Sequence, residues 1–167
     1  MSITVVDIYR ALYFIFPAYC ANAAPVIFGG GRPIDAGRTF LNGKPFLGSN
    51  KTIRGFFSGL LIGTLVGCVQ HLLTPEEAPI LLGFVLSLGA LVGDLTESFI
   101  KRRLNLPPGS SLPVADQLDF VVGAVFFSFL VSPPPLSVLL IVLIITPPIH
   151  LLTNILAYLL GVKKNWW

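Results

Sequence analysis

Between residues 93 and 119, four carboxylates and three consecutive basic residues lie between two apolar stretches. Four polar side chains have the spacing i, i+3, i+4, i+7, which on a helix places them on one face: Asp94, Glu97, Ser98 and Lys101. Asp116 and Asp119 repeat the i, i+3 spacing at the start of the next apolar stretch. Mg²⁺ characteristically binds one or two carboxylates together with substrate phosphates. The segment therefore predicts a site that holds a metal and handles phosphate.

Each member of this group also has a simpler interpretation. Glu97 and Lys101 have the spacing of an ordinary helical ion pair, and residues 101–103 have the composition of a basic flank beside a membrane span. Asp116 and Asp119 stand where acids stabilise a helix N-terminus. The combination favours the metal site, because acids at membrane depth are costly and are usually paired or functional.

A second segment, residues 28–55, is rich in glycine and carries five basic residues: Arg32, Arg38, Lys44, Lys51 and Arg54. Glycine lets backbone N–H groups approach an anion closely, and the basic side chains supply countercharge. Lys51, Thr52 and Arg54 directly precede or begin the next apolar stretch, near a helix N-terminus that favours phosphate. The alternative is a positively charged tether that rests on anionic lipid.

The elements that must position these residues are membrane-spanning helices. Of the 167 residues, 54% are hydrophobic and 11% are charged, which is the composition of an integral membrane protein. A span needs roughly 20 apolar residues, and five candidates are present: residues 5–27, 55–73, 80–100, 117–132 and 136–160. The fold class is therefore all-α and polytopic, with a single integral domain over 1–167. Pro147 and Pro148 are expected to kink or interrupt the last span.

The basic residues fix the expected orientation. Apart from Arg10, they all lie between spans one and two, between spans three and four, or after span five. The positive-inside rule then places the N-terminus outside, the loops 28–54 and 101–116 in the cytoplasm, and the C-terminus with its Trp166 and Trp167 anchor in the cytoplasm. Residues 8–24 also have some features of a cleaved signal peptide, but cleavage would export the basic loop. The charge rule favours a retained span in a multi-pass cell-membrane protein whose active site faces the cytoplasm.

Other polar or small residues within the spans have mostly structural interpretations. Cys20 and Cys68 are far apart and predict no disulfide or zinc site. His71 and His150 are interpreted as packing or interfacial residues, and Asn154 as an inter-helix hydrogen-bonding group. Glycines at 59, 63 and 67 form two overlapping GxxxG patterns, which predict either close helix packing or the face of a homodimer.

The motifs together resemble a known family. The run from Gly93 to Arg102, GDLTESFIKR, followed by Asp116-x-x-Asp119, resembles the signature of CTP-dependent phosphatidate cytidylyltransferases, the CDP-diacylglycerol synthases. Lys51-Thr52-x-x-Gly55 is similar to an upstream element of that family. The short chain, the five spans and the loop from Pro33 to Gly55 look closest to its archaeal branch, the CDP-archaeol synthases. Residues 113–115 and 106–109 depart from the bacterial pattern, and Asn42 stands where an acid is expected, so it receives no metal role.

The resemblance implies Mg²⁺-dependent transfer of CMP from CTP to the phosphate of an isoprenoid glycerol-ether lipid, with release of pyrophosphate. It implies metal binding by Asp94, Asp116 and Asp119, with Glu97 as a further candidate, and a catalytic role for Lys101 as well. It also implies that CTP or its phosphates contact a set of polar and basic residues: Arg38, Lys44, Asn50, Lys51, Thr52, Arg54, Ser98 and Arg102.

The expected partners are CTP, a lipid phosphate (digeranylgeranylglyceryl phosphate in the archaeal branch) and the bilayer, with no nucleic acid. Two alternatives stay open at this point. One is a phosphatidate cytidylyltransferase that acts on a diacyl lipid. The other is a small membrane transporter with an intramembrane acidic cation site. The acids cluster at one membrane face and no inverted repeat is visible, which favours the enzyme.

Overall fold

Five helices make up most of the chain. The computed structural model describes residues 3–40, 43–107, 110–163 and 165–166, and in these residues only two isolated β-bridges accompany the helices. The helices are, in chain order, α1 (Val5–Phe28), α2 (Ile53–Leu73), α3 (Ile80–Arg103), α4 (Ala115–Ser128) and α5 (Leu136–Leu159). The all-α class is therefore confirmed, and the predicted spans agree with the helices to within a few residues at most ends.

Four of the helices, α1, α2, α3 and α5, are long and apolar enough to cross a membrane. Helix α4 has 14 residues, about 21 Å at 1.5 Å per residue, and is shorter than the bilayer core. Helix α5 is continuous through Pro147 and Pro148, so of the two expected effects, a kink or an interruption, the interruption is absent, and α1 likewise contains Pro17 and Pro25. The chain is a multi-pass membrane protein.

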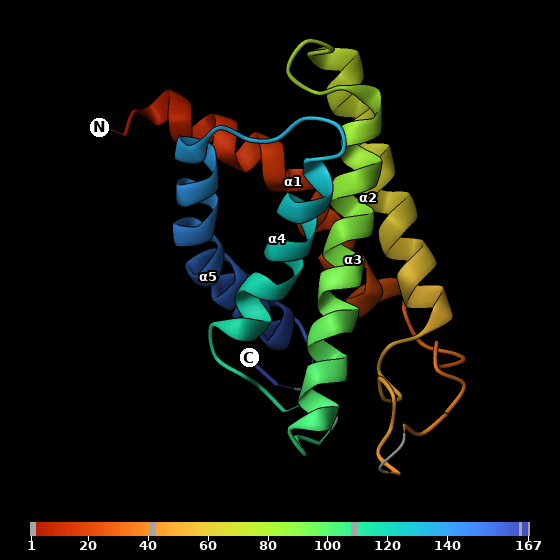
Figure 1. The fold of residues 1–167 in the computed structure, drawn as a ribbon. Coiled ribbons are helices and arrows are strands. Elements are labelled where there is room, and N and C mark those ends of the chain that lie inside the picture. The colour runs from red at the N-terminus through yellow and green to blue at the C-terminus, as the bar shows by residue number, and fades with distance from the viewer. Residues whose placement is uncertain (1–2, 41–42, 108–109, 164, 167) are drawn as a thin grey trace.

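The elements alternate between two ends of the molecule (Figure 1). The start of α1, the turn between α2 and α3 and the connection between α4 and α5 lie at the end drawn uppermost, here called the upper end. The segment between α1 and α2, the end of α3, the start of α4 and the end of α5 lie at the opposite, lower end. This arrangement puts the two basic loops and the C-terminus at one end, as the sequence predicted.

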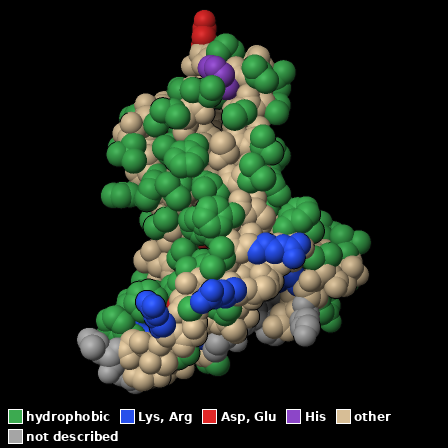
Figure 2. All heavy atoms as spheres, turned by 90° about the vertical axis from the view of Figure 1, so that its right-hand side faces the viewer, with side chains coloured by type: hydrophobic (Ala, Val, Ile, Leu, Met, Phe, Trp, Pro, Cys, Tyr) green, Lys and Arg blue, Asp and Glu red, His purple; other side chains and the backbone are tan. Residues whose placement is uncertain are grey.

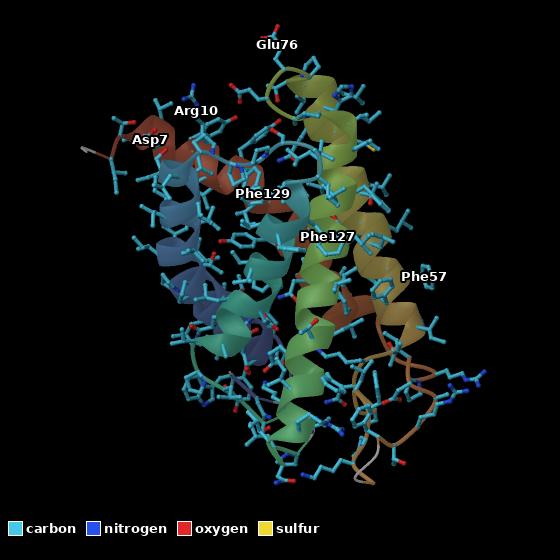
Figure 3. The ribbon with its side chains drawn as sticks, in the orientation of Figure 1. Asp7, Arg10, Phe57, Glu76, Phe127 and Phe129 are labelled. Atoms are coloured by element: carbon cyan, nitrogen blue, oxygen red, sulfur yellow. The ribbon has the colours of Figure 1, made fainter. Side chains whose placement is uncertain are left out.

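The surface shows the same division. In Figure 2 hydrophobic side chains cover most of the face over α2, and Lys and Arg side chains gather toward the lower end. Arg32, Arg38 and Arg54 are all exposed. Figure 3 shows Asp7, Arg10 and Glu76 at the upper end, away from the basic segment. The apolar band lies between charged ends, which is the surface that a bilayer requires.

The packed core occupies the upper half of the molecule. Its buried residues come from four helices: Ala11, Ile15 and Ala18 of α1, Leu82, Val85, Leu86 and Ala90 of α3, Phe120, Val121, Ala124 and Val125 of α4, and Val138, Ile141 and Val142 of α5. Below this core the hydrogen bond between the Tyr19 and Thr146 hydroxyls, 2.8 Å long, joins α1 to α5.

The GxxxG glycines of α2 are used inside the chain. A Cβ atom at Gly63 would lie 2.7 Å from the Pro17 carbonyl oxygen of α1, and one at Gly67 would lie 2.3 Å from the Gly83 Cα of α3. Small residues allow this close approach of helix backbones in a membrane. Of the two interpretations of the motif, close packing within the chain is the one that the structure shows.

Candidate active site

A cavity of about 980 Å³ occupies the lower half of the molecule, beneath the core. All five helices, the segment 29–52 and the C-terminal residues contribute to its lining. Cavities of this size accommodate drug-sized or larger ligands. Most of the residues that the sequence predicted for the site line this cavity: Asn50, Lys51, Thr52, Asp94, Glu97, Ser98, Lys101, Arg102, Asp116 and Asp119.

A close contact between α3 and α4 positions two of the acids. A Cβ atom at Gly93 would lie 2.3 Å from the Asp119 carbonyl oxygen, so the two backbones touch at this level. The contact places Asp94 and Asp119, which flank it, at the same part of the cavity, and their charges act on one another. Asp119 Oδ1 also accepts a hydrogen bond of 2.6 Å from the Phe120 N–H. This placement agrees with the hypothesis that two antiparallel helix ends at the same side of the membrane could bring the acids together.

Asp94 is held by Lys51. The Lys51 Nζ donates to both carboxylate oxygens of Asp94 at 2.6 Å, and each side chain is 25% exposed. Lys51 lies near the end of the glycine-rich segment and Asp94 lies on α3, so this ion pair joins the two predicted chemical segments directly. One positive and one negative group thus face the cavity together.

Lys101 lies at the centre of a second ionic group. Its Nζ is 2.7 Å from Glu97 Oε1 and 2.6 Å from Asp116 Oδ1, and it donates to the Ser110 carbonyl at 3.0 Å. The residue is only 6% exposed. Both carboxylate oxygens of Asp116 also accept from the Leu112 N–H at 3.1 Å. This group fastens Ser110 and Leu112, which precede α4, to α3 and to the start of α4.

Arg102 presents a buried cation to the cavity. It is 5% exposed, its Nε donates to the Ser98 carbonyl at 3.5 Å, and its Nη1 has no hydrogen-bond partner among the described residues. An unpaired guanidinium nitrogen is costly to bury unless an anion completes its bonding. Ser98 is also buried and lines the same cavity. The pair is suited to hold a phosphate, for which a guanidinium is a preferred partner.

Three predicted phosphate-binding residues lie elsewhere. Arg38 and Arg54 are exposed, Lys44 is half-buried, and none of them lines the cavity. Thr52 lines it, but its hydroxyl accepts from the Gly55 N–H at 3.1 Å and so caps α2. Asn42 and residues 108–109 lie outside the described residues.

Asp35 organises the segment that covers the cavity. Its carboxylate accepts hydrogen bonds of 2.9 to 3.0 Å from the N–H groups of Gly37, Leu47 and Gly48. Burial favours its neutral form, but these backbone donors outweigh that effect and hold the pKa of Asp35 below its ordinary value. No local pattern indicated this structural role, because the donors come from residues up to 13 positions away.

Arg103 attaches the same segment to α3. Its Nη2 donates to the Pro45 carbonyl at 2.6 Å, and its guanidinium lies 4.8 Å from the Phe40 ring centroid and 5.0 Å from that of Phe99. Phe46 packs against both rings. Cation–π contact and aromatic packing therefore stabilise the position of the segment against α3. A structural role for Arg103, as opposed to a phosphate contact, agrees with these interactions.

Three lining residues at the end of α5 had no predicted role in the site: His150, Asn154 and Lys163. The Lys163 Nζ donates to Asn154 Oδ1 at 3.0 Å, and Asn154 Nδ2 lies 3.3 Å from His150 Nδ1. Burial lowers the pKa of Lys163. The sequence spacing of His150 and Asn154, i and i+4, does place them on one helix face, but nothing local showed that this face borders a cavity.

The carboxylates suit a cation that is completed by a substrate. Within the described residues, no three His, Cys, Asp or Glu side chains converge to hold a metal ion by themselves. Asp94 and Asp119 nevertheless place two acids at one part of the cavity, which is the protein share of a typical Mg²⁺ site that also uses phosphate oxygens. Asp116 has both oxygens engaged with Leu112 and Lys101. Asp94 and Asp119 therefore fit the ion better than Asp116 does.

Comparison with known proteins gives one consistent result. A sequence model described as CarS-like CDP-archaeol synthase matches residues 3–167. The chain is 44% identical to the CDP-archaeol synthase of Methanocaldococcus jannaschii, with 96% of this chain and 97% of the relative covered. It is 48% identical to that of Pyrococcus horikoshii, with 95% and 96% covered.

A solved structure agrees in fold. It is described as an intramembrane enzyme for archaeal membrane lipids biosynthesis, and it aligns with a TM-score of 0.82 and 36% identity over 89% of this chain and 94% of its own.

Proposed function

The chain belongs to the CDP-archaeol synthase family of membrane nucleotidyltransferases, and from that premise we propose that it uses Mg²⁺ and CTP to activate digeranylgeranylglyceryl phosphate. The reaction would form a CDP-archaeol-type lipid and pyrophosphate. The site would face the cytoplasm from the cell membrane. The observation that carries the proposal is the cavity, in which the ion pairs of Lys51 and Lys101 lie beside apolar residues of α1 and α5.

The chemistry is a phosphoryl-centre substitution. A phosphate oxygen of the lipid attacks the α-phosphorus of CTP and forms a new P–O bond. The bond from that phosphorus to the oxygen that bridges to the β-phosphate breaks, and pyrophosphate leaves with its electron pair. The nucleophile is already ionised, so the protein needs no strong general base. Its contribution is to position the reactants and to stabilise charge.

Two basic groups support binding of the nucleotide phosphates. Arg102 offers a buried Nη1 that an anion would complete, and Ser98 lies beside it in the cavity wall. Lys51 is tied to Asp94 at the end of the glycine-rich segment, so a triphosphate bound there would contact both the cation and the segment. Arg38, Lys44 and Arg54 stand outside this cavity and would at most contribute to the positive potential of the lower end.

Asp94 and Asp119 are the residues that would hold Mg²⁺, together with substrate phosphate oxygens. Bound there, the ion would neutralise triphosphate charge and stabilise the charge that develops at the reacting phosphorus. Lys51 would then be displaced from Asp94 toward a phosphate or would share it, since an ammonium cannot ligate the metal. Glu97 and Asp116 would keep Lys101 in place.

The test is a nucleotide and lipid-phosphate panel with the purified protein in detergent. We expect pyrophosphate release only with CTP, a lipid phosphate and Mg²⁺ together, and more with digeranylgeranylglyceryl phosphate than with diacyl phosphatidic acid. Equal or greater rates with phosphatidic acid would establish the diacyl alternative. No release with any lipid phosphate, combined with nucleotide-independent ion flux in proteoliposomes, would replace the enzyme by the transporter.

A further inference from the structure

The chain reverses direction after α5 and turns the Lys163 side chain back onto the cavity. Gly161 has φ = +72°, and the Val162 and Gly161 N–H groups donate to the Ala157 and Tyr158 carbonyls. This is the hydrogen-bond pattern of a Schellman motif, which ends a helix and reverses the chain direction. As a result Lys163, four residues beyond the end of α5, reaches Asn154 on its own helix and lines the cavity.

The hydrogen bonds in this group have a defined direction. An ammonium group only donates, so Asn154 presents its carbonyl oxygen to Lys163. Its amide nitrogen therefore faces His150 and donates to the ring nitrogen Nδ1. In a neutral imidazole the proton then resides on Nε2. The outcome is a pair of hydrogen-bond donors, the Lys163 ammonium and the His150 Nε2–H, both fixed by Asn154.

The surroundings of this pair are apolar and face lipid. Ile149 and Leu156 of α5 and Leu160 at its C-cap line the same cavity, together with Val26 and Ile27 at the end of α1. Leu160 is 77% exposed and Ile27 is 67% exposed, which places them at the boundary between cavity and bilayer. An anion that binds the two donors would therefore adjoin an apolar surface, and a lipid phosphate has that combination of groups.

The pair also faces the acids and the nucleotide-binding side. The charges of Asp116 and Lys51 act on Lys163, and those of Asp116 and Asp94 act on His150. These groups thus border the same space from the α5 side, whereas Arg102 and Ser98 border it from α3. A transfer reaction between two phosphates needs two groups of anion-binding residues that face the same reacting space.

From this arrangement we propose that Lys163 and His150, oriented by Asn154, bind the phosphate of the acceptor lipid, with its chains along the apolar surface of α5 and α1. This inference rests on the proposed function. It assigns the nucleotide phosphates to the α3 side of the cavity and the attacking lipid phosphate to the α5 side. Asn154 is a positioning residue, because it acts through its two neighbours.

The test separates the two substrates. Apparent KM is measured for digeranylgeranylglyceryl phosphate as its mole fraction in mixed micelles, at saturating CTP, and then for CTP at saturating lipid. Lys163→Gln should raise the lipid KM by roughly ten- to a hundredfold, the range for loss of a hydrogen bond to a charged group, and leave the CTP KM nearly unchanged. Lys163→Arg should recover much of the loss. Asn154→Leu should shift the lipid KM in the same direction.

Arg10→Gln is the matched control, since it also removes one positive charge but lies exposed at the upper end (Figure 3).

Native mass spectrometry of the lipid-phosphate adduct without CTP gives a second measurement, in which Lys163→Gln should weaken the adduct. An unchanged lipid KM, or a shift in the CTP KM alone, would overturn the inference. Wild-type activity in the same assay would still support the proposed function. A wild-type protein without activity would refute the proposed function, and the adduct measurement would still decide the α5 assignment. If Lys163→Gln fails to fold, the lipid KM of Lys163→Arg and of Asn154→Leu decides the inference.

Discussion

Asp94 and Asp116 have the same side chain and line the same cavity, yet their surroundings suit them to different roles. Asp94 pairs with the flexible ammonium of Lys51 and lies beside the acid Asp119. Asp116 is fastened by Lys101 and by the Leu112 backbone. An acid that is held by a movable cation can exchange it for a metal and phosphates, whereas an acid that is held by backbone is part of the scaffold.

Asp94→Asn and Asp119→Asn should each lower the rate of pyrophosphate release by roughly a hundredfold or more, while the protein remains monodisperse in detergent. The reason is that a neutral amide is a poor ligand for Mg²⁺. Glu76→Gln, an exposed change at the upper end (Figure 3), removes the same charge and should leave the rate unchanged. Near-normal turnover in both aspartate variants would remove the metal assignment.

Lys101→Ala should act on stability at least as much as on CTP use. The substitution leaves Glu97 and Asp116 without their shared cation in a site that is largely buried, and breaking a buried ion pair costs about 3–5 kcal/mol. Thermal unfolding in detergent should shift clearly downward. The double variant Lys101→Ala/Glu97→Gln should recover part of the loss, because it removes one of the uncompensated charges. An unchanged melting temperature with a raised CTP KM would instead make Lys101 a nucleotide-binding residue.

At the scale of elements, the contact between α3 and α4 sets the geometry of the site. Gly93 and Asp119 touch through their backbones, and one turn higher a Cβ at Gly89 would lie 2.4 Å from the Gly123 carbonyl oxygen. Both contacts depend on the absence of a side chain on one helix. The separation of the two acids is therefore fixed by glycines that make no contact with a substrate.

Gly93→Ala should lower the melting temperature and the turnover together. The added methyl group would overlap the Asp119 carbonyl, and overpacking of this kind costs typically about 1–3 kcal/mol. Moving α4 away from α3 also moves Asp119 away from Asp94. Thr96→Ala, at an exposed position one turn further along α3, is the matched control and should change neither quantity. A Gly93→Ala protein with wild-type turnover would show that the acids do not need this helix spacing.

The helices themselves were predictable, because hydrophobic runs of the length of a bilayer report directly on spans. The pairing of polar groups across elements was less predictable from the sequence. The spacing of Asp94, Glu97 and Lys101 predicted a shared face, but the choice of Lys51 as partner for Asp94 depends on how α3 rotates against the 29–52 segment. The group of His150, Asn154 and Lys163 required knowledge of the α5 C-cap and of the cavity, which only the packed helices provide.

At the scale of the whole molecule, the two ends differ in charge and in structure. The lower end carries the basic segment, the ion pairs and the cavity, and the upper end carries the packed core and short turns. A substrate with a charged head and long apolar chains matches this division, since its head would lie at the charged end and its chains along the lipid-facing walls.

The orientation in the cell membrane is testable by cysteine labelling. After Cys20 and Cys68 are replaced by alanine, a single cysteine at Ser49 should react with a membrane-impermeant maleimide only after cells are opened, because the basic end is expected in the cytoplasm. A single cysteine at Glu77 should react on intact cells. Both positions are exposed, so accessibility within the protein is matched. The reverse pattern would place the active site outside.

The location of the core above the cavity has a consequence for motion. Backbone amides of α1, α3, α4 and α5 beside the core are enclosed by packed side chains, whereas the lower turns of the same helices border an open space. Local opening should therefore require least free energy at the lower ends, and hydrogen exchange should rise along each helix from the core toward the cavity. A bound substrate would fill that space and slow exchange there selectively.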